Sequence, residues 1–254
     1  MDMKEQSLDF LWITYFGITK TEAKNNKNKA AFACADRAYR DLCRRIPYRY
    51  KSSDIEKNKK KYKDYIDLKD SFREVVCDYI INSIEGINGE FDDFHRTTCG
   101  GIIALSDGTD NEHPEYKKLF EPVKRDTAKK TCINYGLAQK WLNMTVKNML
   151  VMGLWDDLFK PYLSSIHVPI DSYILDAAGG TKGDLICEGE DVKHLGIKSK
   201  EYFGKYSWSK IPDDEQDIKK YYQYQDEIRT STNNNQIEWE HEAWIAESKK
   251  NKKW

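Results

Sequence analysis

Apolar and small residues recur along this chain at helical spacing, which predicts a protein built mostly from helices. The clearest stretch runs from Ala30 to Ile46, where Pro47 ends the pattern. Alternation typical of strands is scarce, and its best candidate is the short apolar run at 102–105. The expected helices cover residues 30–46, 57–84 with a break, 91–101, 139–152, 171–179, 219–230 and 237–249. We therefore predict an all-α fold, with 107–127 as a connecting region.

The composition indicates a folded, water-soluble protein of 254 residues. The seven Trp and sixteen Tyr exclude a disordered chain, which lacks the apolar surface to offset ordering entropy. The longest apolar run, 149–155, is too short to span a bilayer. The first residues lack the features of a signal peptide, so we expect no membrane partner and a cytoplasmic location. This length suits one helical domain over 1–254, either undivided or with lobes at 1–110 and 111–254.

The formal net charge of −1 counts against the strong non-specific nucleic-acid affinity that excess Lys and Arg provide. The charge is unevenly distributed, however. Segments 51–63 and 117–130 are each rich in basic residues, whereas 213–247 carries ten acids against three bases. This pattern fits a basic surface and an acidic C-terminal region that face different ways, and it equally fits ordinary solvated faces.

The helix expected from Gln139 carries a polar stripe opposite its apolar one. Lys140, Asn143 and Lys147 follow one another at i, i+3 and i+7, which is typical of a solvated face. A lysine amine can also act as a nucleophile when it is neutral, and a nearby carboxylate then steadies the cation that forms. Asp171 is the candidate carboxylate, because Pro169 suits the first turn of a helix and places Asp171 near the helix N-terminus. There it can serve as a cap, as a catalytic group, or as both.

The segment Gly-Leu-Ala-Gln-Lys at 136–140, followed by a helix, a loop and Val-Pro-Ile-Asp at 168–171, resembles the helix-hairpin-helix DNA glycosylases. It is closest to the 8-oxoguanine DNA glycosylase branch and its archaeal relatives. The resemblance implies that Gly136 is the first glycine of the hairpin turn, Lys140 the Schiff-base lysine and Asp171 the essential aspartate. It also implies a glycosylase-like helical fold, no cofactor, and double-stranded DNA with a damaged or modified base as the partner.

The implied reaction is attack of Lys140 on C1′ of an oxidised or modified purine nucleoside, followed by strand cleavage through AP lyase chemistry. The target nucleotide must leave the base stack, and aromatic and amide side chains would then hold it. Candidate pocket residues are Gln139, Asn143, His167 and Trp208, and candidate DNA contacts are Gly136 and Lys147. Each of these residues also has an ordinary structural interpretation.

Two other classes of function stay open from the sequence. One is a non-catalytic helical module that binds nucleic acid or protein, for example in defence against phage. The other is a binder of a nucleotide signal or small ligand. The near-neutral charge favours these alternatives, and the Lys140–Asp171 arrangement favours the enzyme. The sequence leaves the oligomeric state open.

Metal chemistry is not predicted. His95 and Cys99 could place two ligands on one helix face, but no second Cys or His pair has suitable spacing. The six cysteines are widely separated and form no Cys-x-x-Cys pair, so we expect reduced, mostly buried thiols.

Overall fold

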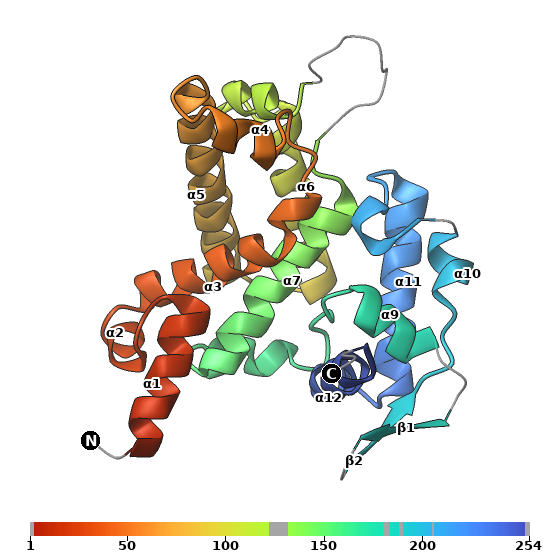
Figure 1. Ribbon diagram of the computed structural model, residues 1–254. Coiled ribbons are helices and arrows are strands. Elements are labelled where there is room, and N and C mark those ends of the chain that lie inside the picture. The colour runs from red at the N-terminus through yellow and green to blue at the C-terminus, as the bar shows by residue number, and fades with distance from the viewer. Residues whose placement is uncertain (1–2, 122–131, 180–182, 188–189, 205, 252–254) are drawn as a thin grey trace.

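Helices dominate the structure, a computed structural model that describes residues 3–121, 132–179, 183–187, 190–204 and 206–251 (Figure 1). The first helices are α1 (Met3–Phe16), α2 (Lys20–Asn25), α3 (Lys27–Leu42), α4 (Ser52–Lys57), α5 (Lys63–Glu85) and α6 (Phe91–Asp107). The later helices are α7 (Tyr135–Met152), α8 (Asp156–Phe159), α9 (Ser172–Gly179), α10 (Ser199–Phe203), α11 (Glu215–Ser231) and α12 (Gln236–Asn251). Short 3-10 turns are η1 (Cys43–Arg45), η2 (Pro114–Leu119), η3 (Lys160–Tyr162) and η4 (Trp208–Lys210). The predicted all-α class is confirmed.

A small β-hairpin accompanies the helices. Strand β1 (Gly183–Cys187) pairs antiparallel with β2 (Glu190–His194). In Figure 1 the hairpin lies at the lower right beside α12, and it packs against α9 as well. Within the described residues it is the only sheet, so it adds an edge to the helical assembly and leaves the fold class unchanged.

The strand candidate at 102–105 is wrong, because these residues lie inside α6. The buried residues Cys99, Ile102, Ile103 and Ser106 fall at i, i+3, i+4 and i+7, which is the stripe of a helix. The expected stop near residue 101 is also wrong. At Gly101 the Tyr79 ring packs where a Cβ would stand, so this glycine allows a close helix contact. The helix ends at Gly108, whose φ of +76° is the left-handed conformation of a C-cap.

Helix α7 forms the centre of the molecule, and it packs against α3 and α6 (Figure 1). The contact with α3 is close because α3 presents buried alanines to it. The fully buried Trp141 packs its ring 5.1 Å from that of Tyr39 and donates a hydrogen bond to the Ala35 carbonyl at 3.1 Å. The hydrophobic core is one cluster that extends from Phe16 to Ala246. Side chains on α7 can therefore meet residues from both halves of the chain.

The glycine at the start of α7 has a different role from the one expected. The sequence predicts a turn at Gly136, but α7 already begins at Tyr135, where the Asn134 side chain caps it by accepting from the Leu137 amide at 3.1 Å. A Cβ on Gly136 would overlap the carbonyl oxygen of Trp208. The Gly136 amide donates to the Ile211 carbonyl at 3.2 Å. The missing side chain thus lets η4 lie against the first turn of α7.

No helix in the described part of the chain is both long and apolar enough to cross a membrane. Cys34, Cys43, Cys77 and Cys99 are free thiols, as expected from their spacing. Cys34, Cys77 and Cys99 are buried, and burial raises the pKa of each of these thiols.

Candidate active site

Lys140 and Asp171 meet, although 31 residues separate them in the chain. The Lys140 Nζ lies 2.9 Å from the Asp171 Oδ2, and the two side chains are 7% and 17% exposed. Lys140 lies in the second turn of α7, and Asp171 directly precedes α9. Because water can hardly solvate a charged pair with so little exposure, hydrogen bonds from the protein must stabilise it.

Asp171 uses its two oxygens for different purposes. Its Oδ1 accepts from the Ile174 amide at 3.0 Å and so caps α9. Its Oδ2 accepts from the Lys140 amine and also lies 3.3 Å from the Trp244 Nε1. Helix α9 begins at Ser172, so Pro169 precedes the helix and does not lie in its first turn as expected. The carboxylate is therefore a cap that keeps one oxygen facing the lysine.

Two tryptophan side chains contact the pair. The Trp208 ring centroid lies 5.8 Å from the Lys140 amine. Trp244 is 38% exposed, and its ring meets that of Tyr173 edge to face at 5.4 Å. Rings at such a position offer flat apolar surfaces on which a nucleobase could stack. Trp208 was predicted from the sequence as a pocket residue, whereas Trp244 and Tyr173 were not.

The second lysine of the polar stripe is also paired inside the protein. The Lys147 Nζ lies 2.8 and 2.7 Å from the two carboxylate oxygens of Glu240, whose side chain is 1% exposed. Burial raises the pKa of Glu240, and the charge of Lys147 opposes that shift. The expectation of a solvated face on α7 is therefore wrong, because Lys140 and Asn143 are buried and the Lys147 side chain is only 16% exposed. The C-terminal helices α11 and α12 supply residues that cover this stripe.

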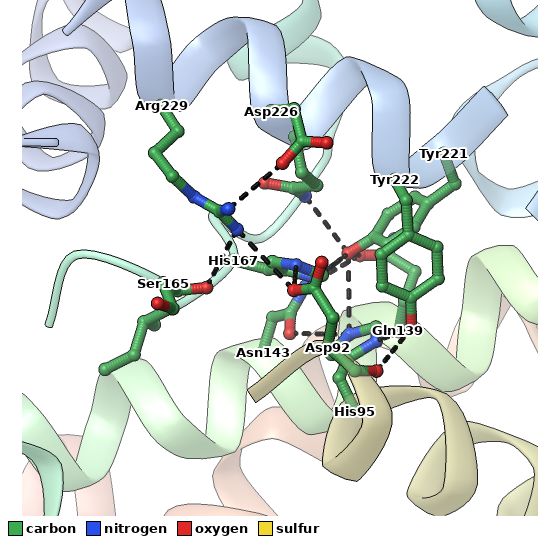
Figure 2. Close-up of polar contacts among 12 residues, drawn as sticks. Asp92, His95, Gln139, Asn143, Ser165, His167, Tyr221, Tyr222, Asp226 and Arg229 are labelled. Atoms are coloured by element: carbon green, nitrogen blue, oxygen red, sulfur yellow. Dashed lines mark hydrogen bonds and ion pairs between the residues drawn. The ribbon is translucent and has the colours of Figure 1, made fainter. Parts of the chain in front are cut away.

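The other predicted pocket residues belong to a buried hydrogen-bond network (Figure 2). The Asn143 amide nitrogen donates to the Tyr221 hydroxyl at 2.9 Å and to the Gln139 Oε1 at 3.1 Å. The Asn143 Oδ1 lies 3.0 Å from the His95 Nε2, which donates to it because an amide oxygen can only accept. The Gln139 Nε2 donates to the carbonyl of Gly136 at 2.9 Å. These amides already have protein partners.

His167 links this network to the protein surface. Its Nε2 donates to Asp92 at 2.9 Å, and its Nδ1 accepts from the Tyr221 hydroxyl at 3.3 Å. Burial lowers the pKa of His167, and it lowers the pKa of His95 well below its ordinary value. Burial alone would raise the pKa of Asp92, but the hydrogen bond from His167 and the charge of Arg229 lower it. Both histidines are therefore neutral at pH 7.

Tyr221 and Gln225 of α11 were not predicted from the sequence as residues of the site. They occupy the buried stripe of their helix together with Ile228, at spacings of four and three residues. The only sign of this in the sequence is a glutamine within an otherwise apolar stripe. Such a glutamine indicates a buried hydrogen-bond network, because a buried amide needs hydrogen-bond partners. The described residues contain no group of His, Cys, Asp and Glu side chains that could hold a metal ion.

Comparison with known proteins adds no assignment to this geometry. No family model matches the chain, and no curated protein or solved structure matches it.

Proposed function

We propose that this chain is a lysine-dependent DNA glycosylase with AP lyase activity, acting on an oxidised or modified purine in double-stranded DNA. The observation that carries the proposal is the ion pair of Lys140 and Asp171 at 2.9 Å, set among the rings of Trp208, Trp244 and Tyr173. A nucleophile, a carboxylate that can offset a developing cation and stacking surfaces for an extruded base are the parts that this chemistry needs.

In the proposed reaction the Lys140 ammonium, which is ion-paired with Asp171, first loses a proton to solvent. The resulting free amine attacks C1′ of the extruded nucleotide. The bond from C1′ to the base breaks, and its electron pair leaves with the base, which takes up a proton. The Asp171 carboxylate offsets the positive charge that develops on the sugar. Opening of the sugar ring and loss of a proton from nitrogen give a Schiff base. Removal of a C2′ proton then expels the 3′ phosphate and cleaves the strand.

One observation favours the second candidate, a helical binding module without turnover. The Lys140 side chain is only 7% exposed and already ion-paired, so substrate must displace groups that cover it. The polar groups of Gln139 and Asn143 are likewise engaged within the protein. A binding module would retain its affinity for its partner when Lys140 is replaced.

Borohydride reduction tests the proposal. Wild-type protein is incubated with duplexes that contain 8-oxoguanine, other oxidised purines or an abasic site, and the reduced adduct is detected on a denaturing gel and located by mass spectrometry. We expect an adduct on Lys140 that is absent from Lys140→Gln. Lys210→Gln is the matched control, because Lys210 is an exposed lysine in η4, two residues from Trp208. No adduct with any duplex, or equal adduct in Lys140→Gln, would contradict the enzyme and leave the binding module.

A further inference from the structure

The segment that carries Asp171 has no regular secondary structure of its own. Residues 166–171 lie between η3 and α9 and form neither helix nor strand. Buried backbone groups without such partners need hydrogen bonds from elsewhere. Side chains from distant helices hold this segment at its start and at its middle, and this arrangement suggests how the position of the carboxylate is fixed.

Gln225 of α11 holds the middle of the segment at Val168. Its Oε1 accepts from the Val168 amide at 3.1 Å, and its Nε2 donates to the Val168 carbonyl at 2.9 Å. One side-chain amide thus satisfies both backbone polar groups of a residue, as a neighbouring strand would. Gln225 is 2% exposed and Val168 is fully buried. Val168 lies three residues before Asp171.

The same amide is tied to the helix that carries the lysine. The Gln225 Nε2 also donates to the Tyr221 hydroxyl at 3.0 Å, and that hydroxyl accepts from the Asn143 amide at 2.9 Å. Asn143 lies one turn beyond Lys140 on α7. A short chain of buried hydrogen bonds therefore runs from the segment that bears the carboxylate to the helix that bears the amine.

The start of the segment has a comparable support. The Gln236 Nε2, from the start of α12, donates to the Leu163 carbonyl at 3.1 Å and to the Ile166 carbonyl at 3.0 Å. Gln236 is also 2% exposed. Like Gln225, it forms side-chain hydrogen bonds to the backbone, but its partners lie five residues or more from Asp171. Gln236 is therefore a natural control for a role specific to Gln225.

We infer that Gln225 is a positioning residue for the reaction proposed above: by holding both backbone groups of Val168, it fixes the Asp171 carboxylate beside the Lys140 amine. The inference rests on the proposed function. Replacing Gln225 with Met keeps the volume and removes the bonds, so the segment can move relative to α7. A displacement of about 1 Å at a catalytic group slows reaction on the order of 100-fold.

The experiment compares two rates in each variant. Release of the damaged base needs both Lys140 and a correctly placed Asp171, whereas adduct formation with a preformed abasic site needs chiefly the amine. Wild type, Gln225→Met and Gln236→Met are measured with an 8-oxoguanine or other oxidised-purine duplex that the wild type cleaves, and with an abasic duplex. Circular dichroism confirms that each variant is folded at the assay temperature, and Gln225→Asn replaces Gln225→Met if the latter does not fold.

We expect Gln225→Met to slow base release by 10- to 100-fold while abasic adduct formation changes less than threefold, and Gln236→Met to affect the two rates equally. Equal losses of both rates in Gln225→Met, or no loss of base release, would overturn the positioning role while the glycosylase proposal stands. If the wild type releases no base and forms no adduct, the proposed function fails, and the positioning role fails with it.

Discussion

Mild acid should destabilise this protein before its carboxylates titrate, because of two buried histidines. His95 and His167 are 0% and 1% exposed, and burial lowers the pKa of both rings. Below the ordinary histidine pKa of about 6.5, the unfolded chain binds protons that the folded protein excludes, so the free energy of unfolding falls as the pH falls. Each buried histidine can contribute at most about 1.4 kcal/mol per pH unit.

Between pH 6.5 and pH 5 this limit corresponds to about 2 kcal/mol for His95, whose pKa lies well below its ordinary value. His167 contributes less, because its hydrogen bond to Asp92 opposes the effect of burial. Since a domain of this kind is stable by roughly 5–15 kcal/mol, a loss of this size is easily measured.

The assay is urea unfolding of wild type and His95→Gln at pH 7 and pH 5, followed by the fluorescence of the seven tryptophans. Wild type should be the more stable protein at pH 7, because His95 makes buried hydrogen bonds to Asn143 and Tyr222. At pH 5 the difference between the two proteins should shrink by about 2 kcal/mol, since only wild type has this ring to protonate on unfolding. The carboxylates occur in both proteins and cancel. If the difference is the same at both pH values, protonation of His95 on unfolding does not contribute to the acid sensitivity.

Three further experiments test other parts of the site by substitution. Gly136→Ala should lower stability by about 1–3 kcal/mol, because the new methyl group must displace the Trp208 carbonyl; an unchanged melting temperature would contradict this close packing. Glu240→Ala should cost about 3–5 kcal/mol in urea unfolding because it leaves the Lys147 charge without its partner, and adding Lys147→Met should restore most of that loss. Asp171→Ala should be about 1 kcal/mol less stable than Asp171→Asn, since only Asn can still cap α9; equal urea midpoints would show that the cap contributes little.

Helical periodicity predicted much of the architecture from local pattern alone. The expected helices at 30–46, 139–152, 219–230 and 237–249 correspond to α3, α7, α11 and α12. Helix α1 was missed because its apolar residues face several sides, including exposed Phe10 and Leu11, and so form no single stripe. The β-hairpin was missed because its strands carry no clear alternation.

The glycines show where local reasoning misleads. Gly101 and Gly136 look like stops or turns in the sequence, yet both lie in helices and make room for a neighbouring element. Whether a glycine breaks a helix or admits a neighbour depends on residues far away in the chain, here Tyr79 and Trp208.

The candidate site was predictable only where its parts lie in short motifs. The pairing of Lys140 with Asp171 followed from two such segments, and the structure brings these residues together. The hydrogen bond of Gln225 to Val168 spans 57 residues, and that of Tyr221 to Asn143 spans 78. No local pattern encodes contacts of that range, so only the folded structure identifies them.

The buried thiols can report local opening of the helix packing. Cys34, Cys77 and Cys99 lie on α3, α5 and α6, and their raised pKa values keep them as unreactive thiols in the folded protein. An alkylating reagent can modify each of them only when the surrounding helix packing separates. Mass-resolved labelling of the three positions would therefore measure how often each helix detaches, without any introduced probe.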